Sequence, residues 1–191
     1  MIKKRINKTA LGAMFLAVGI VLPFFTGQIP QIGSMLLPMH IPVFLCGLIC
    51  GGRYGAAVGF IMPLMRSFLF GMPPIFPTAI AMAFELSAYG FIVGFAYEKA
   101  RWHCIKSLYR CMIAAMLGGR AIWGIVMLVL LGIGTEGFTA AAFISGAFLN
   151  AVPGIILQFI IIPGIMLALD KTHLVPFGKN EKAKFYKKAT D

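Results

Sequence analysis

Charged residues are scarce in this chain, and acidic residues are the scarcest of them. Only 12% of the 191 residues are charged, and six Asp and Glu stand against 17 Lys and Arg. A soluble domain must solvate its surface, which is difficult for a chain that is 60% hydrophobic with a mean hydropathy of +0.90. The composition therefore excludes a soluble domain and predicts an integral membrane protein.

Short alternating apolar segments, the pattern of membrane β-barrel strands, are also missing. The apolar residues instead form long continuous runs, and a helix that crosses a bilayer needs about 20 residues. The sequence predicts an all-α, polytopic membrane protein with six transmembrane helices at about Thr9–Phe25, Leu36–Cys50, Tyr54–Phe70, Pro77–Tyr97, Ser107–Gly132 and Ala140–Leu169. Gly51 and Gly52 predict a hairpin turn between the second and third helices. Residues 1–170 then form one transmembrane domain, and residues 171–191 form a basic cytoplasmic tail.

Lys and Arg are absent from three of the predicted connections, at about Thr26–Met35, Gly71–Phe76 and Ile133–Thr139. All but two of the 17 basic residues flank the other connections or the chain ends. Because basic residues concentrate on the cytoplasmic side of membrane proteins, both termini are predicted to be cytoplasmic. The net charge of +11 is then explained by this bias together with attraction of the basic residues to anionic membrane lipid. The basic residues are dispersed over several loops, which argues against nucleic-acid binding.

Residues for catalysis and metal binding are few. Cys46 and Cys50 are four apart with no neighbouring ligand residues, which is not the spacing of a zinc site, and all four cysteines are expected to be reduced thiols. One His, one Glu and no Asp fall within the predicted spans, so no metal trio or nucleophile–base pair is available. The pair Gly178–Lys179 lacks the upstream glycine loop of an ATP site. The sequence predicts no enzyme, no metal and no cofactor in this chain.

Three ionisable residues nevertheless fall inside predicted helices, namely Arg66, Glu85 and Arg120. Such groups cost several kcal/mol in a bilayer unless they are paired or hydrated, so each is a candidate functional residue. At ~1.5 Å per residue, Glu85 and Arg120 come within reach of each other, either as a structural clamp or as part of a site. Arg66 then has no carboxylate partner, and it is expected either to bind an anionic solute or to extend to the outer headgroups.

Other polar residues are predicted at the same depth. His40, Asn150 and Ser67 can face an outer cavity, although a lone His in a helix is often an ordinary interior residue, and Met72 can cap a ligand from the third connection. The predicted substrate-binding residues are Arg66, Arg120, Glu85, His40, Asn150, Met72 and Ser67.

Prolines accompany these residues in two of the predicted helices. Pro38 and Pro42 in the second, and Pro153 with Gly154 in the sixth, are predicted to break the helices and free backbone carbonyls. Free carbonyls at membrane depth are tolerated where protein or a water-filled cavity satisfies them. The prolines therefore predict a cavity wall.

The run LLPMHIPVFLCGLICGGRYGAAVGFIMPLMRSFLFGMPP, followed by AFELSAYG and GRAIWG, resembles a known family. These stretches are similar to the substrate-binding S components of energy-coupling factor (ECF) vitamin transporters, in the branch with pantothenate, cobalamin and folate carriers. The resemblance covers about Ala10 to Leu169 and implies a six-helix protein of the bacterial plasma membrane with an outward-facing pocket. It also implies partners, a transmembrane coupling subunit and two ATPase subunits that use ATP.

Small residues repeat along one side of the first predicted helix. Thr9, Ala13 and Ala17 form a stripe that allows another helix to approach closely, and AMFLA matches the AxxxA pattern by which such S components dock on the coupling subunit. The alternative is internal packing, which is the interpretation for Gly55 with Gly59 and for Gly90 with Gly94.

Taken together, the residues and the resemblance predict a non-enzymatic subunit that captures a water-soluble vitamin or vitamin precursor. A pantothenate-like anion is favoured, because Arg66 and Arg120 carry two positive charges against the single negative charge of Glu85. One carboxylate of the solute would neutralise the remaining positive charge. The alternative is a stand-alone secondary transporter or channel for a small solute, in which Glu85 is the candidate for ion coupling.

Overall fold

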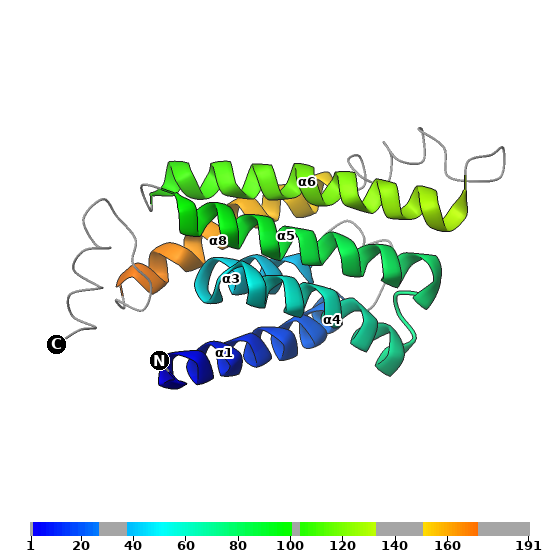
Figure 1. The fold of residues 1–191 in the computed structure, drawn as a ribbon, viewed down its shortest axis with the longest axis horizontal. Helices are drawn as coiled ribbons and strands as arrows, with labels where there is room; N and C mark the ends of the chain where they lie inside the picture. Colours follow the sequence, from blue (N-terminus) through cyan, green and yellow to red (C-terminus); the bar gives the residue numbers. More distant parts are fainter. Residues whose placement is uncertain (1, 27–37, 101–103, 133–150, 172–191) are drawn as a thin grey trace.

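The computed structural model describes residues 2–26, 38–100, 104–132 and 151–171. Over these ranges the secondary structure is helical and contains no strand, which confirms the predicted all-α class for them (Figure 1). The elements are α1 (Ile2–Val21), the 3₁₀ segment η1 (Leu22–Thr26), α3 (His40–Cys50), α4 (Gly52–Phe70), the π-helical segment η2 (Ile75–Ala79), α5 (Ile80–Lys99), α6 (Ile105–Leu131) and α8 (Val152–Lys171). The predicted tail beyond Lys171 lies outside the described residues.

Helix α3 begins later than the sequence predicts, and the difference involves proline. Helix α3 begins at His40, so Pro38 precedes it and Pro42 lies in its first turn. The first four N–H groups of a helix have no partner within that helix, so Pro42 removes no helical hydrogen bond there. Pro153 lies in the first turn of α8, and the predicted start of the sixth helix, at about Ala140, lies outside the described residues. The prediction that Pro42 breaks a helix and frees a carbonyl is therefore wrong, whereas the predicted effects of Pro38 and Pro153 involve preceding residues that lie outside the described part of the chain.

A different proline lies inside a helix and removes one of its backbone hydrogen bonds. Pro163 lies inside α8 and has no N–H to donate to the carbonyl of Phe159, four residues earlier. The hydroxyl of Tyr109, on α6, donates a hydrogen bond to that carbonyl at 3.0 Å. Tyr109 therefore supplies the donor that proline lacks and ties α6 to α8.

Among the described residues, three segments are long and apolar enough to cross a membrane by length and composition. They are Ile75–Lys99, Ile105–Leu131 and Val152–Asp170, and shorter apolar helices occupy Lys8–Phe24 and His40–Cys50. The apolar helices support a membrane protein, while six crossings stay a prediction.

The start of α1, the turn between α3 and α4, and the end of α8 lie at the same end of the helical bundle (Figure 1). Gly51 alone separates α3 from α4, and its φ of +103° is a conformation that glycine adopts at little cost, which confirms the predicted hairpin turn. The side of the membrane that this end faces, predicted to be cytoplasmic, stays a prediction.

Glycines bring the backbones of α3, α4 and α5 into direct contact. A Cβ atom added to Gly55 would lie 2.7 Å from the Cα atom of Gly47 and 2.8 Å from the carbonyl oxygen of Gly90. Added Cβ atoms on Gly59 and Gly94 would also meet backbone atoms of the neighbouring helix. The predicted internal packing of these glycines is confirmed, because only small residues permit such close approach.

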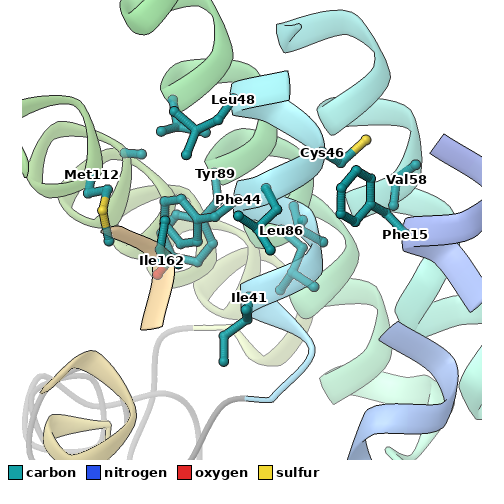
Figure 2. Close-up of a cluster of buried hydrophobic side chains, with 14 of the residues drawn as sticks. Phe15, Ile41, Phe44, Cys46, Leu48, Val58, Leu86, Tyr89, Met112 and Ile162 are labelled. Atoms are coloured by element: carbon teal, nitrogen blue, oxygen red, sulfur yellow. The ribbon is translucent and has the colours of Figure 1, made fainter. Parts of the chain in front are cut away.

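Apolar side chains from several helices fill the interior beside this glycine contact. Phe44 of α3, Leu86 and Tyr89 of α5, Met112 of α6 and Ile162 of α8 belong to one buried cluster (Figure 2). The polar residues described next therefore lie among closely packed helices.

Candidate functional site

Glu85 and Arg120 form a buried ion pair between α5 and α6. The Oε1 atom of Glu85 lies 2.8 Å from Nη1 of Arg120, which confirms the predicted contact. Glu85 is 2% exposed and Arg120 is 6% exposed. The preceding Gly119 has no side chain, and a Cβ atom there would lie 2.5 Å from the ring of Tyr89. The absence of that Cβ atom lets α6 approach α5 closely enough for the two charges to meet.

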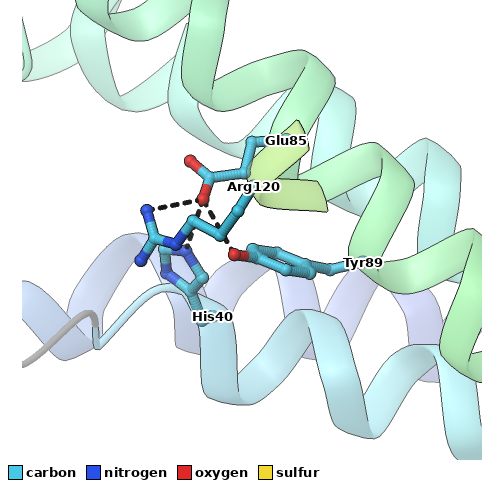
Figure 3. Close-up of polar contacts among 4 residues, drawn as sticks. All are labelled: His40, Glu85, Tyr89 and Arg120. Carbon is cyan, nitrogen blue, oxygen red and sulfur yellow. Dashed lines mark hydrogen bonds and ion pairs between the residues drawn. The ribbon is translucent and has the colours of Figure 1, made fainter. Parts of the chain in front are cut away.

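Two further polar side chains approach the same carboxylate oxygen. The hydroxyl of Tyr89, one helical turn from Glu85 on α5, donates a hydrogen bond to Oε1 at 2.9 Å. The Nε2 atom of His40, the first residue of α3, lies 3.9 Å from Oε1 (Figure 3). His40 and Tyr89 are each 2% exposed. We call His40, Glu85, Tyr89 and Arg120 the polar cluster.

The polar cluster holds opposite charges in an environment of low polarity. A buried carboxylate is tolerated there because a guanidinium and a hydroxyl both donate to it. A guanidinium has five N–H donors, so Arg120 has donors beyond the one directed at Glu85. Chemically, the cluster is therefore suited to binding a further acceptor, such as a carboxylate, and its charges also stabilise the packing of α5 on α6.

The sequence did not indicate Tyr89. Its spacing of four residues from Glu85, in the stretch ELSAY, places both side chains on the same side of a helix. That spacing is the signal that could have identified it.

Arg66 has a different environment from the polar cluster. Its Nη1 atom donates a hydrogen bond to the carbonyl of Ile20 at 2.7 Å, in the last turn of α1. Its guanidinium carbon lies 5.3 Å from the ring centroid of Phe24 and 5.6 Å from that of Phe70. The last carbonyls of a helix lack partners within it and attract a cation, and aromatic faces do the same. Arg66 therefore stabilises the end of α1.

Arg66 also lies at a different level of the bundle. Gly59 of α4 packs against Leu86, which follows Glu85. Arg66 comes seven residues after Gly59 in α4, which corresponds to about 10 Å along the helix. Arg66 is 4% exposed, so it is not extended into the surroundings of the isolated bundle.

The remaining predicted substrate-binding residues do not join the polar cluster through any contact in the described part of the chain. The hydroxyl of Ser67 donates a hydrogen bond to the carbonyl of Pro73 and so fixes the chain after α4. Met72 is 43% exposed. Asn150 lies outside the described residues. Of the seven predicted residues, the structure brings together His40, Glu85 and Arg120.

Metal ligands do not gather in the part of the chain that the structure describes, where no three His, Cys, Asp or Glu side chains lie close enough to hold an ion. All four cysteines are free, with Cys46, Cys50 and Cys111 buried.

The small-residue stripe on α1 faces outward. Thr9, Ala13 and Ala17 are exposed, whereas Gly12, Phe15 and Gly19 face α3 and α4. Internal packing within the described bundle therefore does not account for the stripe, and its surface is accessible to another helix.

A protein-family model described as "ECF transporter, substrate-specific component" matches residues 7–168 of the chain. The match includes the polar cluster, the α1 stripe and every described helix in whole or in large part. No curated protein matches the chain, and no solved structure does.

Proposed function

The chain belongs to the family of substrate-specific components of ECF transporters, and from this premise we propose that it captures a pantothenate-like anion. Membership of the family makes the chain a substrate-binding subunit of a transporter and a membrane protein, not an enzyme. It also favours this role over that of a stand-alone transporter or channel. We place the protein in the bacterial plasma membrane as a multi-pass subunit.

The observation that carries the choice of an anion is the buried guanidinium of Arg120. It lies where α3, α5 and α6 meet, 2.8 Å from Glu85, and the imidazole of His40 approaches the same carboxylate. We propose that a carboxylate of the solute binds the donors of Arg120 that Glu85 does not use. A planar guanidinium recognises carboxylates through paired, charge-assisted hydrogen bonds, which favours Arg for this role.

Arg120, and not Arg66, is the cation that we propose for the solute. One N–H group of Arg66 binds the carbonyl of Ile20 at the end of α1, and two aromatic rings contact its guanidinium, so Arg66 lies apart from the polar cluster. Together the two buried arginines still exceed the single buried acid, Glu85, by one charge among the described residues. One carboxylate of the solute balances that excess.

Pantothenate and panthenol offer a matched pair of ligands for testing this proposal. Panthenol has an alcohol in place of the carboxylate and is otherwise the same molecule. Titration calorimetry on the purified protein is expected to show one pantothenate bound per chain, with panthenol at least tenfold weaker, because a charge-assisted hydrogen bond is lost. Equal affinities for the two would contradict the role of the charge, and failure of pantothenate to bind would reject this vitamin.

The family also implies the partners of an ECF module, a membrane coupling subunit and ATPase subunits. We propose that two ATPases hydrolyse the ATP and that this chain itself needs no cofactor. The exposed stripe of Thr9, Ala13 and Ala17 on α1 is the proposed docking surface for the coupling subunit. Small side chains allow close helix approach where lipid provides no hydrophobic driving force.

Substitution of Ala13 or Ala17 by Leu is expected to reduce uptake by the assembled transporter roughly tenfold or more, because the larger side chain blocks close approach. Solute binding by the isolated subunit is expected to stay unchanged, since the stripe faces away from the polar cluster. Ala114→Leu, at an exposed position on α6, is the matched control and should change neither quantity. Loss of solute binding in the Ala13 variant would show instead that the stripe supports the fold of the subunit.

A further inference from the structure

We infer that α4 and α5 together form a binding site for one anionic phospholipid, whose phosphate binds Arg53 and Lys99 and whose acyl chain lies along neighbouring phenylalanine rings. The inference goes beyond the capture of a solute and does not depend on which solute binds. It assigns a specific lipid to one place on a chain whose basic residues are otherwise only generally attracted to anionic membrane lipid.

Four phenylalanines form an exposed apolar surface across α4 and α5. Phe60 of α4 lies edge-on to Phe84 of α5, with ring centroids 5.5 Å apart, and Phe91 stacks with Phe95 at a centroid distance of 5.7 Å. Each of these residues is between 40% and 46% exposed, so the described helices leave the rings largely uncovered. We call Phe60, Phe84, Phe91 and Phe95 the aromatic face. In a membrane protein, a surface of this kind is covered by acyl chains or by another apolar partner.

Two cations lie at one end of the aromatic face. The Nζ atom of Lys99 is 4.2 Å from the ring centroid of Phe95, so the lysine side chain lies against this ring. Arg53 follows Gly52, where an added Cβ atom would lie 3.1 Å from the backbone nitrogen of Phe95. Both cations are exposed, and Lys99 is the last residue of a candidate membrane span. The start of α4 and the end of α5 lie at the same end of the bundle (Figure 1). Both charges are therefore near the level of Phe95, where a membrane-crossing helix ends.

Acidic residues do not neutralise these two charges. Neither Arg53 nor Lys99 forms an ion pair with another residue that the structure describes. Glu98 lies over Gly51 instead, where an added Cβ atom would contact its Oε1 atom and would lie 4.0 Å from Nζ of Lys8. Two positive charges without a nearby carboxylate attract a phosphate, and they repel the ammonium group of a zwitterionic headgroup.

The dimensions of the aromatic face match an acyl chain. Phe84 and Phe95 are eleven residues apart on α5, which corresponds to about 16 Å along the helix. Half of the ~30 Å hydrocarbon layer, the depth of one leaflet, is about 15 Å. An acyl chain whose phosphate binds at Arg53 and Lys99 therefore extends to the contact between Phe60 and Phe84. Large exposed rings prevent the close approach of another helix, whereas a flexible acyl chain adapts to them, which favours a lipid over a protein partner.

Native mass spectrometry of the purified protein in detergent, titrated with phosphatidylglycerol or phosphatidylethanolamine, tests the inference. We expect one phosphatidylglycerol per chain, bound at least tenfold more tightly than phosphatidylethanolamine, because two basic residues act on its net negative charge. Arg53→Gln combined with Lys99→Gln is expected to weaken phosphatidylglycerol binding at least tenfold and to remove this preference. Lys106→Gln combined with Arg110→Gln removes two exposed charges at the start of α6 and is the matched control, with binding expected within about threefold of the wild-type value.

Equal binding of the two lipids by the wild-type protein would overturn the inference, and so would an equal loss in the control variant, which would show only a general attraction of basic residues. Arg53→Lys combined with Lys99→Arg keeps both charges, so a tenfold loss in this variant would contradict recognition by charge. Displacement of phosphatidylglycerol by millimolar inorganic phosphate would contradict the role of the acyl chain. Dimers of the protein without bound lipid would assign the aromatic face to a second copy of the chain.

Discussion

Replacement of Glu85 by Gln is expected to lower the free energy of unfolding by about 3–5 kcal/mol, because it leaves the charge of Arg120 buried without a counter-ion. The ion pair spans 2.8 Å, and neither side chain is more than 8% exposed, so solvent cannot replace the lost partner. Thermal or denaturant unfolding of the purified protein in detergent measures the loss. Glu98→Gln, at an exposed position on the same helix, is the matched control and should change stability by less than about 1 kcal/mol.

The double variant Glu85→Gln with Arg120→Gln separates the ion pair from ordinary packing. Each single substitution leaves one charge alone, whereas the double substitution removes both, so the double variant is expected to be more stable than either single variant. Additive losses would contradict a direct ion pair and would show that each side chain is stabilised by other contacts. Stability of Glu85→Gln equal to that of the wild-type protein would show that Arg120 does not depend on this carboxylate.

The contact between Glu85 and Arg120 could be predicted because the sequence offers few alternatives. Ionisable residues inside apolar helices need partners, and Glu85 is the one acid in the predicted spans. The close packing of Gly55 on Gly90 was predictable for a similar reason, since closely spaced glycines in apolar helices leave room for a neighbouring backbone. In both cases the physical requirement is local to the residue and visible in its sequence context.

The partners of Arg66 could not be predicted, because they depend on contacts between residues far apart in the chain. Its acceptor is a backbone carbonyl, that of Ile20, and every residue has such a group, so the sequence gives no signal for it. The start of α3 was missed because apolar residues continue on both sides of His40, and hydropathy does not distinguish a helical turn from the chain before it.

Substitution of Arg120 by Lys is expected to weaken pantothenate binding roughly ten- to a hundredfold, because Lys keeps the charge but loses the paired donors of the guanidinium. The charge opposite Glu85 is retained, so this variant is expected to fold and to bind panthenol nearly as the wild-type protein does. Calorimetric titration with both ligands measures the two affinities. The expected result is therefore a loss of selectivity for the carboxylate.

Arg66→Lys is the matched comparison, because it makes the same chemical change at the other buried arginine. Its guanidinium stabilises the end of α1 through Ile20 and two aromatic rings, so the expected effect is a lower melting temperature with pantothenate affinity within about threefold of the wild-type value. The opposite result, weak pantothenate binding by Arg66→Lys and normal binding by Arg120→Lys, would assign the carboxylate to the C-terminal part of α4. Since the two residues lie about 10 Å apart along the bundle, a single carboxylate cannot bind to both, and the two titrations distinguish the sites.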